Sequence, residues 1–191
     1  MSSPNPHAID ADTLSGMKPL RKVVYSIGSN LGDRLGNVQG AVDALSDTPD
    51  VIVVDVSSVY ETEPVGAPAD SPAVSPQFLN IVVIAETTLE PRTLVERAFA
   101  IEDAFGRTRD SGRWGPRTLD VDLIMVGNAI VDQEDLRLPH PLAHQRAFVL
   151  VPWYEVDPTA EIAGKGAIGD LLSKADASGV VRRDDLVIDR D

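Results

Sequence analysis

The sequence predicts an α+β fold in which an antiparallel sheet carries its helices on one face. Segments rich in β-branched residues alternate with segments of helical periodicity in the order β-α-β-β-α-β. The chain has 191 residues, of which 43% are hydrophobic, so it is long enough to bury a core without covalent staples. It contains no cysteine, which excludes disulfides and thiolate metal sites.

The first half of the predicted fold is a strand, a helix and a second strand. Residues 22–30 (KVVYSIGSN) are largely apolar and end in a glycine turn, which predicts a strand followed by a tight turn. Residues 33–45 are predicted to be helical because apolar residues recur at three- and four-residue spacing: Leu35, Val38, Val42 and Leu45. Residues 51–60 (VIVVDVSSVY) are β-branched, and we expect one strand there.

The second half repeats this pattern. Residues 78–86 (FLNIVVIAE) predict a third strand, and 119–126 (LDVDLIMV) predict a fourth. Between them a helix is expected to begin at Pro91 and to stop at Gly106. Its apolar stripe consists of Leu94, Ala98, Ile101 and Phe105. A proline-rich loop (63–76) and a basic loop (107–117) interrupt the two halves, and long loops of this kind are often functional.

The order of these elements is that of the ferredoxin-like arrangement, with C-terminal additions. The additions are a small hairpin, a short helix over 142–151 and a helical candidate, AIGDLLSKA. We expect a disordered tail over 1–20, a folded domain over 21–175 and a C-terminal tail of undefined structure over 176–191. Many activities share this fold, so function must come from the site.

Charge and hydropathy exclude two classes of partner. The net charge of −13 argues against a broad basic surface for nucleic acid. No apolar run approaches the roughly 20 residues of a membrane span, and the N-terminal residues lack the features of a signal peptide. We therefore expect a cytoplasmic protein that binds neither nucleic acid nor a membrane. We also expect small-molecule partners and a monomer, although charge and hydropathy do not determine either.

Asp120 and Asp122 are candidates for a metal site. Side chains at positions i and i+2 of a strand point to the same side, so the two carboxylates share one face. Magnesium prefers a few carboxylates together with substrate phosphates, and paired metals suit phosphoryl-type displacement. The alternative is the polar face of an amphipathic strand.

The basic loop makes that alternative harder to sustain. Arg107, Arg109, Arg113 and Arg117 fall within eleven positions directly ahead of the aspartates. Arginine forks suit phosphate oxygens, and a loop after a glycine-ended helix could close over an anionic substrate. Ordinary solvation of a charged loop is the competing interpretation.

Other polar and aromatic residues could complete a pocket. The amide of Asn80 could hydrogen-bond the edge of a flat heterocycle, while Phe78 and Phe148 cover its faces; each could equally be a core residue. His140 and Arg146 could contact a phosphate, or His140 could be a structural turn residue. No G-x-x-x-x-G-K-[ST] motif occurs, so ATP would be bound by side chains and metals.

Five segments, in order along the chain, carry a resemblance to a known family. They are YSIGSNLGDR (25–34), SSVYETEPVG (57–66), QFLNIVV (77–83), GRTRDSGRWGPRTLDVDLI (106–124) and LPHPLAHQRAFVLVP (138–152). The chain thereby resembles the 6-hydroxymethyl-7,8-dihydropterin pyrophosphokinases of folate biosynthesis. The resemblance implies transfer of pyrophosphate from ATP to the hydroxymethyl group of the pterin, with release of AMP. It also implies two Mg²⁺ ions and in-line attack on the β-phosphorus of ATP.

The resemblance further implies a role for each matching residue. The catalytic set would be Arg107, Arg109, Arg113, Arg117, Asp120 and Asp122, with the two aspartates holding the magnesium ions. The pterin would be bound by Thr62, Val65, Phe78, Asn80, Trp114 and Phe148. ATP would contact Arg109, Leu123, His140 and Arg146. The rival hypothesis is a non-catalytic ferredoxin-like module that binds a small metabolite; it does not explain paired aspartates beside four arginines.

Overall fold

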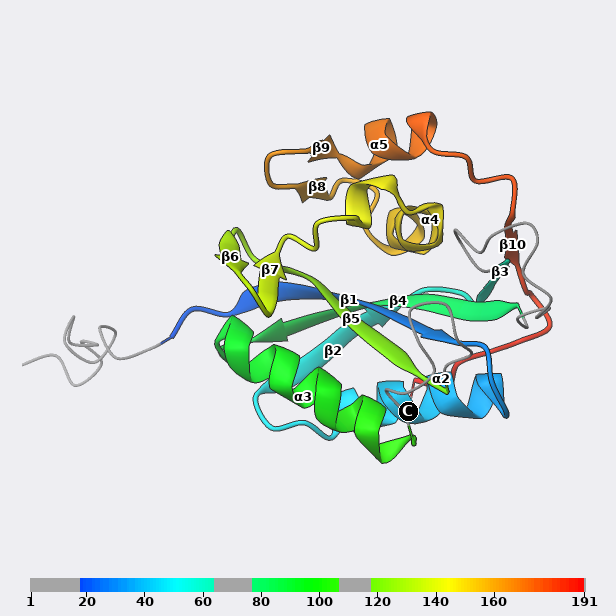
Figure 1. Cartoon of the computed structure of the whole chain (residues 1–191), viewed down its shortest axis with the longest axis horizontal. Helices are drawn as coiled ribbons and strands as arrows, with labels where there is room; N and C mark the ends of the chain where they lie inside the picture. Colours follow the sequence, from blue (N-terminus) through cyan, green and yellow to red (C-terminus); the bar gives the residue numbers. More distant parts are fainter. Residues whose placement is uncertain (1–17, 64–76, 107–117, 191) are drawn as a thin grey trace, which may run out of the picture.

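A computed structural model describes residues 18–63, 77–106 and 118–190 of the chain (Figure 1). The predicted N-terminal tail, the proline-rich loop and the basic loop therefore lie wholly or mostly outside the described residues. The elements of the main sheet and its two first helices are β1 (Arg21–Ser29), α2 (Arg34–Ser46), β2 (Val51–Val56), β3 (Tyr60–Thr62), β4 (Phe78–Thr87), α3 (Pro91–Ala104) and β5 (Asp120–Val126). The elements that follow are β6 (Val131–Gln133), β7 (Leu136–Leu138), the 3₁₀ helix η2 (Ala143–Gln145), α4 (Ala147–Val156), β8 (Glu161–Ile162), β9 (Gly166–Ala167), α5 (Ile168–Lys174) and β10 (Val180–Arg182).

The main sheet is antiparallel in every pairing of the described strands. Its order is β10-β3-β4-β1-β5, and β2 pairs with β4 beside β3. The predicted strand over 51–60 is thus divided into β2 and β3. The pairing with β4 is irregular here, because the register shifts between Val53 and Asp55 and, just after β2, the Ser57 hydroxyl accepts the amide hydrogen of Val82 on β4 at 2.9 Å. A side chain here replaces a backbone partner in the ladder.

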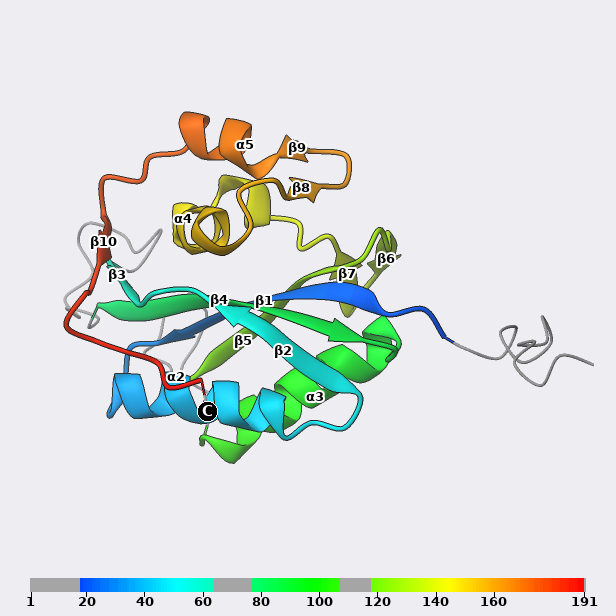
Figure 2. The same ribbon diagram turned by 180° about the vertical axis from the view of Figure 1, so that it is seen from behind.

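The two faces of the sheet have separate cores. Helices α2 and α3 cover one face, and α4 and α5 lie over the other, as Figures 1 and 2 show. On the α2/α3 side the alternate residues of β1, Val23, Tyr25 and Ile27, pack into one buried cluster. On the other side Val24 of β1 and Trp153 of α4 belong to a second cluster. The mixed α/β architecture with an antiparallel sheet therefore agrees with the predicted class.

The helix boundaries follow the sequence signals. Asp33 caps α2 by accepting a hydrogen bond from the Gly36 amide at 3.0 Å, and Pro91 occupies the first turn of α3. Gly106, just past the end of α3, has a φ of 74°, a conformation that glycine adopts at low cost. No helix within the described ranges is long and apolar enough to cross a membrane.

The C-terminal residues are part of the fold. The predicted boundary at 175 treats residues 176–191 as a tail, yet β10 lies in this stretch and pairs with β3. Further along, Ile188 is buried in the core cluster on the α2/α3 side. The sequence did not indicate either contact, because the stretch has no periodicity of its own and its order depends on the sheet edge against which it packs.

Candidate active site

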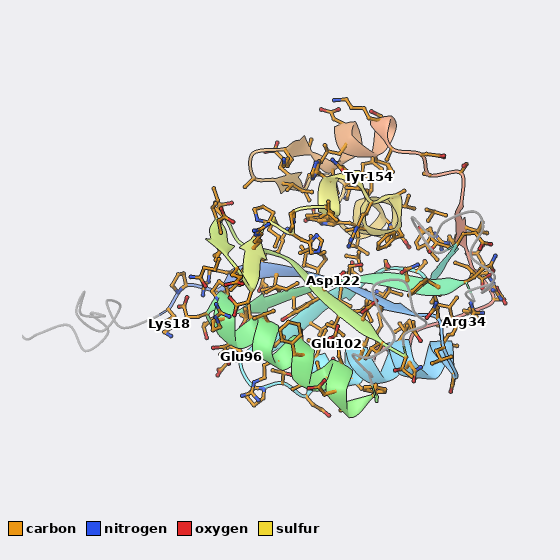
Figure 3. The ribbon with its side chains drawn as sticks, in the orientation of Figure 1. Lys18, Arg34, Glu96, Glu102, Asp122 and Tyr154 are labelled. Carbon is orange, nitrogen blue, oxygen red and sulfur yellow. The ribbon has the colours of Figure 1, made fainter. Side chains whose placement is uncertain are left out.

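The face of the sheet that looks toward α4 brings several predicted residues into one row. Asp120 on β5 lies opposite Gly28 on β1, and Gly28 in turn lies opposite Asn80 on β4. Directly paired residues of antiparallel strands point to the same side, so the Asp120 and Asn80 side chains share this face. Asp122 lies opposite Ser26, one step along the same face (Figure 3).

Gly28, in the middle of this row, places no side chain between Asp120 and Asn80. A Cβ atom at this position would lie 2.8 Å from Oδ1 of Asn80 and 3.5 Å from the ring of Phe78. The first distance is shorter than van der Waals contact allows, so a side chain here would displace the Asn80 amide. The glycine, itself buried, therefore lets the Asn80 amide pack closely against the backbone of β1, between β4 and β5.

Asn80 is buried and held in one orientation. Its Nδ2 donates to Oγ1 of Thr62 at 2.7 Å, and both residues are at most 5% exposed. Its Oδ1 is the atom that faces Gly28. Phe78, partly exposed, precedes it on the same face and lies opposite Thr62. The structure thus brings Thr62, Phe78 and Asn80 together; Val65 and Trp114 lie outside the described residues.

Asp122 belongs to a second group with residues from beyond β7. Nη1 of Arg146 lies 3.6 Å from Oδ2 of Asp122, and the same guanidinium lies 5.5 Å from the ring centre of Phe148. This cation–π geometry places a predicted ATP residue between a predicted metal ligand and a predicted ring-stacking residue. The three residues come from β5, the end of η2 and α4, so only the tertiary fold brings them together.

His140 lies beside this group. Its backbone amide donates to the carbonyl of Ile124 at 2.8 Å, and its Nδ1 accepts the amide hydrogen of Leu142 at 3.2 Å. Burial lowers the pKa of His140 below its ordinary value, with Asp122 acting to raise it and Arg146 to lower it further. The imidazole is therefore neutral at pH 7, with its proton on Nε2.

Leu123 is placed differently from the other predicted ATP residues. Its side chain is 6% exposed and packs in the core cluster on the α2/α3 side, away from Asp122. A contact with a nucleotide from this position would have to come from its backbone. The four predicted arginines, Arg107, Arg109, Arg113 and Arg117, lie outside the described residues.

Sequence reasoning missed two sets of contacts made by described residues before and after the basic segment. Before it, Glu102 of α3 (labelled in Figure 3) is 2% exposed. Its Oε1 accepts the amide hydrogen of Val121, the residue between the two aspartates, at 2.8 Å. After it, the carbonyl of Thr118 accepts from the Ser29 hydroxyl at 2.5 Å and from Nδ2 of Asn37 at 3.1 Å. A signal for Glu102 was present, since it lies four residues after Ala98, on the buried stripe of a helix.

Glu102→Ala is expected to lower the free energy of unfolding by roughly 2–4 kcal/mol, since the Val121 amide would stay buried without its acceptor and a cavity would remain. Glu102→Gln keeps an acceptor oxygen and should lose clearly less. Urea unfolding followed by circular dichroism measures both, with Glu96→Ala on the exposed side of α3 as the matched control. Equal losses in the glutamine and alanine variants would show that the hydrogen bond to β5 is not what matters.

The donor set on this face fits a cation that also binds its substrate. Asp120 and Asp122 supply hard carboxylate oxygens, and the side chain of Asp122 is 40% exposed. Among the described residues, no group of three or more His, Asp or Glu side chains could hold a metal ion. Two carboxylates plus substrate phosphates is the coordination that magnesium favours.

Two carboxylates on β5, an arginine, a buried amide on β4 and two phenylalanine rings thus border the side of the sheet that looks toward α4, a set of groups suited to binding phosphate and a flat heterocycle. Residues 24–158 match the family model of 7,8-dihydro-6-hydroxymethylpterin-pyrophosphokinase (HPPK). The chain belongs to this family. The match confirms the family, the pyrophosphokinase function in folate biosynthesis and the enzyme class that the sequence predicted.

Relatives carry the same assignment. The 2-amino-4-hydroxy-6-hydroxymethyldihydropteridine pyrophosphokinase of Mycobacterium tuberculosis is 45% identical over 157 residues, which is 77% of this chain and 78% of the relative. The enzyme of that name from Methylorubrum extorquens is 39% identical, covering 85% of this chain and 99% of the relative. That from Bacillus subtilis is 42% identical, covering 72% and 79%.

Solved structures agree on the fold. The Plasmodium falciparum HPPK-DHPS wild type with pteroate matches with a TM-score of 0.61 at 13% identity. This match covers 82% of the present chain but only 42% of the Plasmodium chain, so the present chain spans less than half of that protein. At this identity the similarity concerns the fold alone.

Proposed function

We propose that this protein transfers pyrophosphate from ATP to the hydroxymethyl group of 6-hydroxymethyl-7,8-dihydropterin and releases AMP. The observation that carries the proposal is the row Asn80–Gly28–Asp120 across three neighbouring strands. Strands lie about 4.8 Å apart, so the row sets the amide and the carboxylate about 10 Å apart, with a glycine between them. A bicyclic ring bound at Asn80 would extend its substituent over Gly28 toward Asp120.

The pterin subsite would be built on β3, β4 and α4. With Nδ2 of Asn80 engaged by Thr62, Oδ1 would accept a hydrogen bond from the pterin edge. Phe78 and Phe148 would cover the two ring faces, and backbone groups near Thr62 and Val65 would complete the edge contacts. Trp114 would close the site. An oriented, buried amide favours a ligand that supplies the complementary hydrogen-bonding edge.

Two magnesium ions would be held by Asp120 and Asp122. When bound, they would neutralise phosphate charge and increase the acidity of the attacking hydroxyl in an in-line displacement at the β-phosphorus. The residues of the chain would bind and orient the reactants: Arg146 and His140 would contact ATP, and Leu123 would contribute its backbone. A neutral His140 would donate through Nε2 without adding charge.

The arginines of the basic segment would complete the phosphate subsite. Arg107, Arg109, Arg113 and Arg117 would offset charge on the transferring group and on the departing AMP. The support for this part is the sequence pattern together with the position of Thr118, directly before Leu119 and Asp120, whose carbonyl accepts from Ser29 and Asn37. We also propose that the protein acts as a monomer.

We also infer that the fold is ferredoxin-like. The strand order β5-β1-β4-β2 is that expected when two β-α-β units interleave in one antiparallel sheet, and the two connecting helices, α2 and α3, lie together on one face (Figure 2). In this arrangement β2 and β3 pair with successive parts of β4, and α4, α5 and β10 are additions to the ferredoxin-like core.

The proposed function predicts AMP release that depends on the pterin. ATP and Mg²⁺ are incubated with the protein, with and without 6-hydroxymethyl-7,8-dihydropterin, and AMP is quantified by chromatography. AMP that appears only with the pterin, in equal amount to the pyrophosphorylated product, is the expected result. Tight pterin binding without AMP would favour the non-catalytic module instead, and ADP as the product would contradict pyrophosphoryl transfer.

A further inference from the structure

The C-terminal residues beyond the family match form a strap across the edge of the sheet. The match to the family ends at residue 158. The strap, defined as residues 180–190, begins with β10, whose Val180 lies opposite Thr62 and whose Arg182 lies opposite Tyr60. The amide of Arg183 donates to the carbonyl of Val59 at 2.9 Å, which extends the ladder by one step. Strand β3, three residues long, is thus paired on both sides, by β4 and by the strap.

The carboxylate of Glu61 links the strap to the start of α2. Glu61 of β3 accepts from Nη1 of Arg183 at 2.6 Å and from Nη1 of Arg34 at 2.8 Å. Burial acts to raise the pKa of Glu61, but the hydrogen bonds from Arg34 and Arg183 outweigh it and lower the pKa below its ordinary value. Glu61 is therefore ionised near neutral pH, and its side chain is 16% exposed, which limits solvent screening.

This network includes the residues directly before Phe78 and directly before Thr62, two of the proposed pterin residues. Nη1 of Arg34 also donates to the carbonyl of Gln77 at 2.7 Å, directly before Phe78. Glu61 directly precedes Thr62, which orients Asn80. Arg183 is itself fixed by Asp185, whose carboxylate accepts from Nε at 2.8 Å and from Nη2 at 2.7 Å. A bidentate pair holds the guanidinium in one plane while its remaining nitrogen meets Glu61.

The strap also contacts the helix that carries Phe148. Nη1 of Arg182 lies 3.5 Å from Oε1 of Glu155 on α4. The Glu155 carboxylate accepts from the Tyr60 hydroxyl at 2.9 Å and from the Ser58 hydroxyl at 2.6 Å. Burial and the hydrogen bond to Glu155 raise the pKa of Tyr60 to about 12, so the phenol keeps the proton that it donates. The strap is thereby linked to both sides of the proposed ring site.

The far end of the strap is fastened independently. Asp189 exchanges hydrogen bonds with Gln39 of α2, donating its amide at 2.7 Å and accepting at its carbonyl at 3.0 Å. Nη1 of Arg190 donates to Asp55 of β2 at 2.8 Å, and Ile188, directly before Asp189, is buried. A segment fixed at both ends cannot slide along the sheet edge, so it holds β3 in one register.

We propose that the strap is part of the substrate-binding apparatus of this protein and that Arg183 is a positioning residue for the pterin. Arg183 acts through Glu61 and β3 on Thr62 and Asn80, and it touches neither substrate. This inference rests on the proposed function for the identity of the ligand. It predicts an effect on pterin binding that ATP binding does not share, since the ATP residues lie on β5 and near α4 rather than on β3.

The test compares steady-state kinetics of Arg183→Ala, Arg183→Lys and wild type, with rates normalised to the folded fraction. Arg183→Ala is expected to raise KM for the pterin about tenfold and to leave KM for ATP within about twofold, because it removes the charge-assisted hydrogen bond that fixes Glu61 on β3. Arg183→Lys should recover part of the loss. Arg92→Ala is the matched control, because Arg92 of α3 makes a comparable pair with Asp135, between β6 and β7 and away from β3.

Three results would each overturn the inference. The first is a pterin KM for Arg183→Ala within about twofold of wild type, the second is an equal rise in the KM values for pterin and ATP, and the third is an equal effect of Arg92→Ala. If Arg183→Ala does not fold, Glu61→Gln gives the same comparison with a smaller change in packing. Direct pterin binding, followed by the intrinsic fluorescence of the ligand, keeps the question separate from turnover: pterin binding without AMP release would refute the proposed function but not the strap.

Discussion

Asp120→Ala and Asp122→Ala are each expected to lower pterin-dependent AMP release by about a thousandfold or more, because the proposed magnesium ions would lose a charged ligand and the phosphates their orientation. The fold should survive. Both side chains lie on the α4-facing surface of β5 rather than in the core clusters, and the Asp122–Arg146 pair is partly exposed, so its loss costs at most about 1 kcal/mol.

The measurement is a single-turnover assay of AMP formation at saturating pterin and ATP–Mg²⁺. Asp132→Ala on β6 serves as the matched control, since Asp132 is 87% exposed and pairs only with Arg137 among the ion pairs of the described chain. Two further readouts separate the metal role from misfolding: ATP–Mg²⁺ should no longer raise the Tm of the variants, whereas the pterin alone should still bind. Near-normal turnover in either variant would show that the metal assignment is wrong.

Asn80→Ala is expected to reduce kcat/KM for the pterin about a hundredfold, with little change in ATP–Mg²⁺ affinity. The amide is 3% exposed and oriented by Thr62, so its removal deletes the proposed hydrogen bonds to the ring edge and leaves the ring's polar groups unpaired in the site. Thr62→Val should give a smaller loss of about fivefold, since the amide would remain but could turn.

The exposed Asn128, in the turn after β5, provides the matched control for this series. Pterin titrations by fluorescence and initial-rate kinetics should rank the variants in the order Asn128→Ala, Thr62→Val, Asn80→Ala, from least to most impaired. An Asn80→Ala variant whose defect falls on ATP rather than on the pterin would place the heterocycle elsewhere on the sheet.

Local patterns in the sequence were enough to predict most of the elements. Apolar spacing in α2 and α3 and β-branched runs in β1, β4 and β5 are set by neighbours within one or two turns, and burial follows that spacing. The division of β2 from β3 was not predictable, because the irregular pairing there, including the contact of Ser57, involves another strand, β4. Strand β10 was missed for the same reason, since a three-residue strand exists only against its partner.

For the candidate site, the sequence by itself determined the family, the pyrophosphokinase activity and the fact that Asp120 and Asp122 share one face of a strand. The two-residue period of a strand fixes that sharing without any knowledge of the fold. Only the tertiary structure decided which residues meet: Asp122 with Arg146, Asn80 with Thr62, Glu102 with the amide between the aspartates, and Arg183 with Glu61, 122 positions apart. Such contacts depend on how whole elements pack and register against one another, and no local periodicity records that packing.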